Sequence, residues 1–168
     1  KKTLIASAAL ALRGLVSANA KLEKMMKDPN QWVQQSGNYA GERYTELDQI
    51  NKSNVGSLKV AWTFSTGVLR GHEGGPLVIG DVMYVHTAIP NIVYALDLND
   101  NQKILWKYNP VKGGKYPGGE TMDRVISVMC CDNVNRGVNY HPNGTIVLHA
   151  ADTSVIALDA KTGKEKWV

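Results

Sequence analysis

The sequence lacks several features that would each point to a class of function. It has no apolar run approaching the roughly 18 residues of a membrane-spanning helix, so we expect no transmembrane segment. Its only cysteines are Cys130 and Cys131, too few for a structural zinc site with four protein ligands. Its four histidines also lack the i, i+4 spacing of paired metal ligands on a helix.

The sequence also lacks a strong charge of one sign. Its 168 residues include 19 Lys and Arg against 15 Asp and Glu. Three of the basic residues fall within residues 1–20, which contain no acid, so the remaining chain has 16 basic and 15 acidic residues. A nucleic-acid-binding domain is expected to show a basic patch or stripe, and we therefore expect no nucleic-acid partner.

Residues 1–20 have the pattern of a secretory signal. Lys1 and Lys2 precede an apolar core over 4–12, and Ala18-Asn19-Ala20 matches a cleavage site. The alternative is an amphipathic N-terminal helix that is retained. We predict a signal peptide over 1–20 and an exported region over 21–168.

A repeat dominates the rest of the chain. Ala157-Leu158-Asp159 is followed by a polar turn and Trp167, as Ala95-Leu96-Asp97 is followed by a turn and Trp106. A strand–turn–strand unit that recurs in this way is typical of β-propeller blades, although two unrelated hairpins could share such turns. Because a propeller needs about four to eight blades, we expect an all-β protein of which this chain is a piece, with about two W-motif blades.

The local pattern predicts further elements. We expect a short helix within 21–31, a helix over 47–54 behind Thr45-x-x-Asp48, a strand over 58–65 and a solvated loop over 111–123. The blade strands are predicted near 76–79, 82–87, 92–97 and 103–108, and near 125–129, 136–140, 145–150 and 154–159.

The adjacent cysteines are the first candidate for chemistry. An oxidising compartment favours a disulfide between Cys130 and Cys131, although neighbouring Cα atoms lie about 3.8 Å apart, closer than in most disulfides. Such a strained bond could provide a rigid apolar platform for a flat ligand or act as a redox switch. Two buried thiols or an accidental pair are the alternatives.

Two charged residues stand in unusual settings. Glu73 is flanked by glycines in Gly71-His72-Glu73-Gly74-Gly75, which would let the backbone approach a ligand, or would simply form a turn with an exposed acid. Arg136 follows the cysteine pair and could hold a carboxylate in bidentate fashion, or pair with Asp132. His86 and His149 fall at equivalent positions of the repeat, which favours a structural role for both.

These motifs together resemble the pyrroloquinoline quinone (PQQ)-dependent alcohol dehydrogenases, specifically the N-terminal part of the methanol dehydrogenase large subunit. The matching segments are 61–67, 71–77, 128–137 and the tryptophan-docking segment 157–167. The sequences of segments 128–131 and 148–153 are more similar to the lanthanide-dependent branch of the family than to the calcium-dependent one. The loop 112–123 departs from the family pattern.

The resemblance implies an eight-bladed propeller with PQQ on its axis. The Cys130–Cys131 disulfide would form one face of the cofactor site, Glu73 and Arg136 would bond the polar edge of the quinone, and Val134 would lie nearby. It also implies a lanthanide or calcium ion and an Asp base, whose residues would all lie beyond Val168. The implied enzyme is periplasmic, oxidises methanol or a similar primary alcohol to the aldehyde, and passes electrons to a cytochrome c. Dimers are usual in such proteins.

Two other classes of function compete with this interpretation. A non-enzymatic propeller scaffold would share the blade repeat but would have no use for the cysteine pair together with Glu73 and Arg136. A thiol redox module would need a reducible, accessible Cys130 and no PQQ. A quinoprotein dehydrogenase for other alcohols, including types fused to a haem domain, is the alternative within the same fold.

Overall fold

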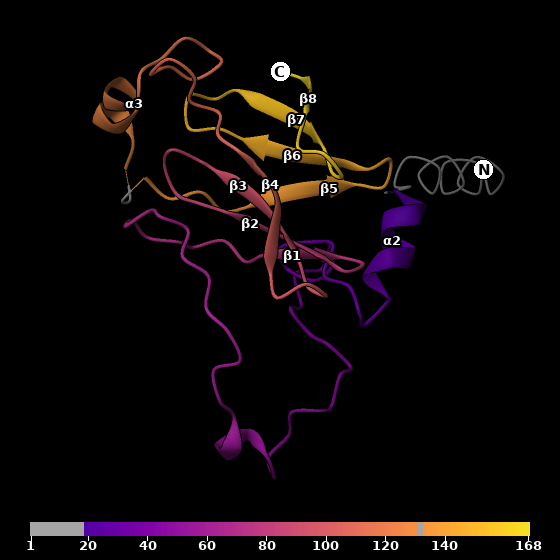
Figure 1. Cartoon of the computed structure of the whole chain (residues 1–168). Coiled ribbons are helices and arrows are strands. Elements are labelled where there is room, and N and C mark those ends of the chain that lie inside the picture. The colour runs from indigo at the N-terminus through magenta and orange to yellow at the C-terminus, as the bar shows by residue number, and fades with distance from the viewer. Residues whose placement is uncertain (1–18, 131–132) are drawn as a thin grey trace, which may run out of the picture.

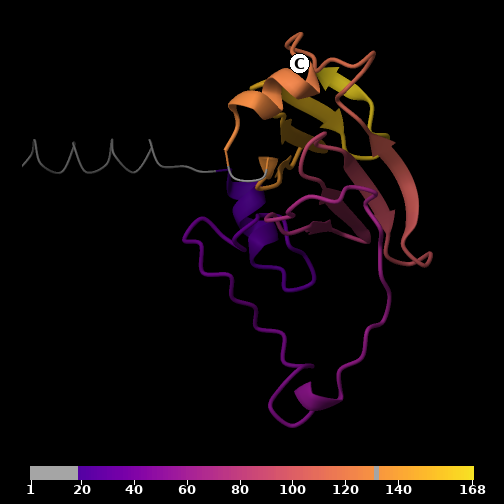
Figure 2. The ribbon, with the colours of Figure 1, turned by 90° about the vertical axis from the view of Figure 1, so that its left-hand side faces the viewer.

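The structure, a computed structural model, describes residues 19–130 and 133–168. It contains two four-stranded antiparallel sheets, each a simple meander (Figure 1). The first comprises β1 (Leu77–Ile79), β2 (Val82–His86), β3 (Val93–Asp97) and β4 (Lys103–Tyr108), and the second comprises β5 (Val138–His141), β6 (Thr145–His149), β7 (Val155–Asp159) and β8 (Glu165–Trp167). The two sheets pack against each other through a shared core (Figure 2).

The two sheets repeat each other down to their irregularities. Ala95 pairs with Trp106 in the first sheet and Ala157 with Trp167 in the second, and each ladder shifts register directly after the alanine. The small side chain leaves room for the ring beside it. The predicted repeat and the assignment of two propeller blades are confirmed, as are the strands predicted for the first blade and those near 136–140, 145–150 and 154–159.

A single core joins the two blades. It contains residues of both sheets that are fully shielded from solvent, among them Leu77, Val93, Ile146, Leu148 and Leu158. A smaller cluster on the other face of the first sheet contains Ile92, Tyr94 and Leu96, covered by Phe64 and Val68. Burial of these apolar side chains, at about 25 cal/mol per Å², favours the stacked arrangement of the sheets.

The N-terminal segment forms a short helix and then joins the first sheet. Helix α2 (Ala20–Met26) begins after Asn19, whose side chain accepts a hydrogen bond from the Leu22 N–H. Further along, Trp32 exchanges two backbone hydrogen bonds with Val78 of β1. The predicted helix within 21–31 is confirmed, while residues 1–18 lie outside the described part of the chain, so the signal peptide stays a prediction.

The predicted strand over 125–129 is wrong. Helix α3 (Met122–Val128) occupies this region and begins after Thr121, whose hydroxyl accepts a hydrogen bond from the Arg124 N–H. Met122, Val125, Ile126 and Met129 turn to the core at helical spacing. β-branched residues favour strands only weakly, and here the cap and the spacing outweigh that preference.

Two predictions for residues 45–65 are also wrong. The Thr45 hydroxyl accepts a hydrogen bond from the Leu47 N–H, which closes a turn, and only the 3₁₀ helix η1 (Val55–Ser57) follows. The predicted strand over 58–65 pairs with no strand in the described residues, and Val60 is 81% exposed. The segment around η1 extends away from both sheets (Figures 1 and 2).

The loop over 111–123 is less solvated than predicted. The Tyr116 side chain is buried against the core, and Gly118 donates its N–H to the Asp152 carboxylate at 2.7 Å. Lys112 forms an ion pair with Glu165 of β8. These contacts anchor the loop to the second blade.

Candidate functional site

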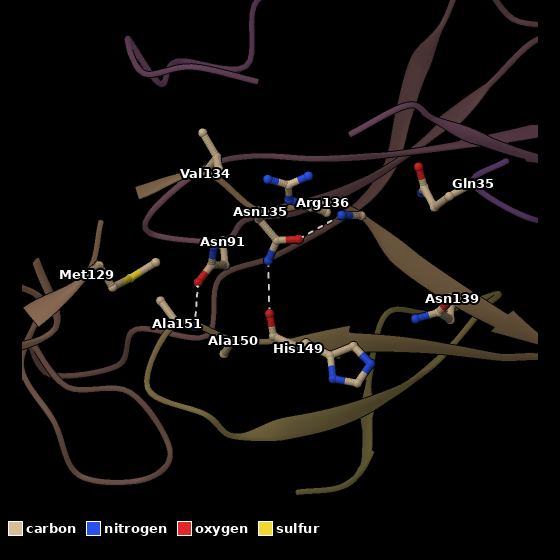
Figure 3. Close-up of a pocket in the computed structure, with 11 residues that line it drawn as sticks. Gln35, Asn91, Met129, Val134, Asn135, Arg136, Asn139, His149, Ala150 and Ala151 are labelled. Carbon is tan, nitrogen blue, oxygen red and sulfur yellow. Dashed lines mark hydrogen bonds between the residues drawn. The ribbon is translucent and has the colours of Figure 1, made fainter. Parts of the chain in front are cut away.

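An open hollow of about 540 Å³ lies where the connections of the two blades meet (Figure 3). Residues from the N-terminal segment, from both blades and from the loop before β5 share its wall. It is lined by Gln35, Asn91, Met129, Val134, Asn135, Arg136, Gly137, Asn139, His149, Ala150 and Ala151. The wall therefore combines apolar side chains with amide groups, the His149 imidazole and the Arg136 guanidinium.

Asn135 ties the loop before β5 to both blades. Its side-chain amide donates to the His149 carbonyl at 2.9 Å and its side-chain oxygen accepts from the Gly137 N–H at 2.9 Å. Its backbone carbonyl accepts a hydrogen bond from Nε2 of His86 at 3.0 Å. β2 and β6 end at His86 and His149, so the equivalent ends of the two blades meet at one residue.

Glu73 and Arg136 lie together beside the hollow. The Glu73 Oε2 and Arg136 Nη2 atoms are 3.3 Å apart, and their side chains are 48% and 82% exposed. An ion pair this exposed contributes only about 0.2–1 kcal/mol to stability. Both charges are thus brought to one place while staying open to a ligand.

Two glycines have little room for a side chain here. A Cβ on Gly74 would lie 2.3 Å from the His86 ring, and one on Gly137 would lie 2.3 Å from the side-chain nitrogen of Gln35. Gly137 also has a φ of +133°, a conformation that other residues rarely adopt. A side chain at position 74 would therefore push the Arg136 backbone away, and one at position 137 would be strained by its φ and would displace the Gln35 amide.

Gln35 and Asn91 are fixed by their own hydrogen bonds. The Gln35 side chain accepts from the Gly75 N–H at 3.1 Å and donates to the Val138 carbonyl at 3.3 Å. The buried Asn91 side chain accepts from the Ala151 N–H at 2.8 Å. Both amides therefore hold segments far apart in the sequence against each other.

The structure brings most of the predicted site residues into one region. Val134 and Arg136 line the hollow, Glu73 pairs with Arg136, and Cys130 directly follows the lining residue Met129. Cys131 lies outside the described residues, as does Asp132, the alternative partner of Arg136. The disulfide and the cofactor-binding roles of these residues therefore stay predictions.

Sequence reasoning missed Gln35, Asn91 and Asn135. Each acts through an amide side chain whose partner lies in another segment, and amides are common on any surface. The one available signal was the density of Asn residues around the cysteine pair, in Asp132-Asn133-Val134-Asn135. Within residues 19–130 and 133–168, no group of three or more His, Cys, Asp or Glu side chains is placed to hold a metal ion.

Comparison with known proteins identifies the family. Residues 32–166 match the PQQ family model described as "Glucose/ethanol/alcohol dehydrogenase, beta-propeller domain". The chain belongs to this family. The predicted resemblance and the propeller fold are thereby confirmed, and the two sheets are blades of a PQQ-family propeller.

Relatives of this family give a finer placement. The lanthanide-dependent methanol dehydrogenase of Methylorubrum extorquens is 54% identical over 98% of this chain and 26% of its own length. Subunit 1 of the methanol dehydrogenase [cytochrome c] of Paracoccus denitrificans is 44% identical over 90% of this chain and 24% of its own length. The higher identity to the first protein agrees with the predicted closeness to the lanthanide-dependent branch.

A solved structure has a fold similar to that of this chain. The europium-containing methanol dehydrogenase superposes with a TM-score of 0.80 at 53% identity, covering 89% of this chain and 24% of the other. This PQQ-family chain thus spans about a quarter of the length of its relatives. In the part that the structure describes, no helix is long and apolar enough to cross a membrane.

Proposed function

We propose that this chain forms part of a periplasmic PQQ-dependent dehydrogenase that oxidises methanol or a similar primary alcohol to the aldehyde and passes electrons to a cytochrome c. The observation that carries the proposal is the Glu73–Arg136 pair, held beside the hollow in a chain of the PQQ family. The names of the relatives support methanol as the substrate, a lanthanide ion and a cytochrome c as the electron acceptor; a calcium ion in place of the lanthanide stays the alternative. Export rests on the predicted signal in residues 1–20.

The chemistry of these residues fits the cofactor. PQQ is a flat, tricarboxylate quinone, and when bound it supplies the two-electron acceptor for alcohol oxidation. The exposed Arg136 guanidinium suits one of its carboxylates, because the fork of N–H donors matches two oxygens. Glu73 would accept a hydrogen bond from an N–H group, and Val134 and Met129 would exclude water from the flat face.

Each residue of this chain then has a role in binding and orientation. Arg136 would exchange part of its contact with Glu73 for the carboxylate, which the weak, exposed ion pair permits. The Cys130–Cys131 pair, as a disulfide, would support the ring from one face. We assign the general base and the metal ligands to the part of the relatives that this chain does not cover, since the chain spans about a quarter of their length.

The test uses the full-length product of the gene that encodes this chain, prepared without PQQ. PQQ is titrated in the presence of a lanthanide or of calcium, and the loaded protein is assayed with methanol, with longer primary alcohols and with an artificial electron acceptor. Saturable PQQ binding and alcohol-dependent dye reduction are the expected results. Absence of PQQ binding would overturn the proposal. Binding without oxidation of any alcohol would leave a non-catalytic PQQ propeller.

A further inference from the structure

The His86 ring contacts both segments that carry the charges of the candidate site. His86 ends β2 and is 4% exposed, and the Nε2 edge of its ring faces the segment of Glu73 and that of Arg136. Glu73 directly precedes Gly74, whose backbone lies against the ring. Arg136 directly follows Asn135, whose carbonyl is bonded by the ring.

The hydrogen bond defines the protonation of the ring. A carbonyl oxygen only accepts, so Nε2 of His86 carries the proton in its 3.0 Å contact with Asn135. The other ring nitrogen, Nδ1, is buried without a hydrogen-bond partner in the described structure. Burial lowers the pKa of His86, and the nearby His72 acts in the same direction, while the bond to Asn135 opposes both. A neutral ring with its proton on Nε2 satisfies this arrangement.

The contacts leave little freedom in the spacing of the two segments. A Cβ on Gly74 would lie 2.3 Å from Cε1 and Nε2 of His86, and 2.8 Å from the carbonyl carbon of Arg136. The ring, the Gly74 backbone and the Arg136 backbone are thus packed against one another. This packing holds the backbones that carry Glu73 and Arg136 close to each other, and their exposed ion pair adds little to it.

We propose that His86 is a positioning residue for PQQ, setting the placement of Arg136 relative to Glu73 through its bond to the Asn135 carbonyl. This inference rests on the proposed function. Binding groups need support from residues that lock their geometry, and His86 supplies such support without reaching the hollow itself, which it does not line. It gives a specific role to a residue that the repeat pattern alone marks only as structural.

The test compares substitutions of His86 in the full-length protein. His86→Gln keeps an amide N–H near the position of Nε2, whereas His86→Leu removes the donor and keeps the volume approximately. The PQQ dissociation constant and the melting temperature of the PQQ-free protein are measured for each variant. His141→Leu, at the exposed end of β5, is the control for loss of a histidine elsewhere in the blades.

The expected result is that His86→Leu weakens PQQ binding about two- to tenfold, the range for one lost hydrogen bond. His86→Gln should restore most of the affinity. The loss should also be non-additive with Arg136→Ala in a double-mutant cycle, because His86 acts through Arg136. A general loss of stability would lower the melting temperature without this coupling.

Several outcomes overturn the inference. Unchanged PQQ affinity in His86→Leu, or a loss fully additive with Arg136→Ala, overturns it while leaving the proposed function intact. A wild-type protein that binds no PQQ overturns both. If His86→Leu does not fold, His86→Asn replaces it, since its shorter amide cannot reach the Asn135 carbonyl. Equal affinity in the Asn and Gln variants then contradicts the proposal.

Discussion

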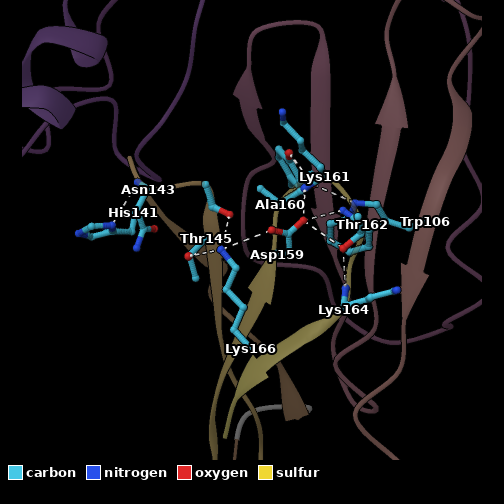
Figure 4. A network of polar contacts seen from close by, with 12 residues as sticks. Trp106, His141, Asn143, Thr145, Asp159, Ala160, Lys161, Thr162, Lys164 and Lys166 are labelled. Atoms are coloured by element: carbon cyan, nitrogen blue, oxygen red, sulfur yellow. Dashed lines mark hydrogen bonds and ion pairs between the residues drawn. The ribbon is translucent and has the colours of Figure 1, made fainter.

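Trp106 of the first blade donates its indole N–H to the Ala160 carbonyl of the second blade at 3.0 Å (Figure 4). Its ring also lies so close to Gly163 that a Cβ there would be 2.6 Å from the ring carbon Cδ2. Tyr84 donates its hydroxyl to the same carbonyl at 3.1 Å. The turn between β7 and β8 is therefore the point at which one blade docks on the next.

Gly163→Ala should destabilise the protein more than Gly144→Ala, a substitution in the turn between β5 and β6. The added methyl group meets the Trp106 ring, and overpacking of this kind costs about 1–3 kcal/mol. Gly144→Ala is the matched control, because Gly144 also has a positive φ but no atom lies within 4 Å of the Cβ that alanine would add. Chemical denaturation of both variants gives the difference in free energy of unfolding. Equal values would contradict the docking role of Gly163.

Arg136→Ala should weaken PQQ binding about 10- to 150-fold, corresponding to the roughly 1.5–3 kcal/mol of a hydrogen bond to a charged group. Arg136→Lys should be intermediate, because it keeps the charge and loses the paired N–H donors. Equilibrium dialysis with PQQ measures both. Lys161→Ala, exposed on the β7–β8 turn, controls for the loss of one positive charge. Full PQQ retention by Arg136→Ala would remove Arg136 from the site.

Cys130 and Cys131 should resist alkylation in the denatured protein without reductant, because we expect them to be joined in a disulfide. Mass spectrometry should show no added alkyl group before reduction and two after it. A Cys130→Ser, Cys131→Ser double variant controls for modification of other residues. Two alkyl groups on the unreduced wild-type protein would rule out the disulfide platform.

Acidification should weaken the turn around Asp159. Its side chain accepts hydrogen bonds from Thr162 and Lys161 (Figure 4). These bonds lower the pKa of Asp159 below its ordinary value of 3.8, and the bond from the Thr162 hydroxyl has the largest effect. A carboxylate whose pKa is lowered in the folded protein stabilises the folded state when the pH is above the ordinary pKa of the group. This stabilisation is lost as the pH falls through the lowered pKa.

Asp159→Asn should therefore lose less stability than the wild type between about pH 5 and about pH 3. Melting temperatures across this range measure the effect. Asp97→Asn is the matched control, because Asp97 ends β3 at the equivalent position and accepts a hydrogen bond from the Asn99 N–H. An identical acid response in the wild type and Asp159→Asn would contradict the role of Asp159.

Two of the errors in predicted structure show where strand propensity misleads. Residues 125–129 read as a strand because Val, Ile and Val favour extended backbone, yet the Thr121 cap and the buried face of α3 make them helical. Residues 58–65 alternate like a strand, but a strand forms only with a hydrogen-bonded partner, and the described structure supplies none. The local sequence pattern favours a backbone conformation, and contacts with neighbouring segments determine whether that conformation forms.

The sequence by itself determined the blades and the family of this protein. The Ala–Asp–Trp repeat is encoded in residues that are close together in the chain, because turns and strand alternation depend on local backbone and side-chain chemistry. The cysteine pair, Glu73 and Arg136 could likewise be selected by their unusual neighbours.

Only the tertiary structure decided how these residues meet. Three contacts join segments that are separated by a turn of the chain or by a whole blade. They are the Glu73–Arg136 pair, the packing of Gly74 on His86, and the hydrogen bond from Asn135 to His149. Such contacts leave no periodic signal in the sequence, because each depends on where two distant backbones are brought by the packing of the blades.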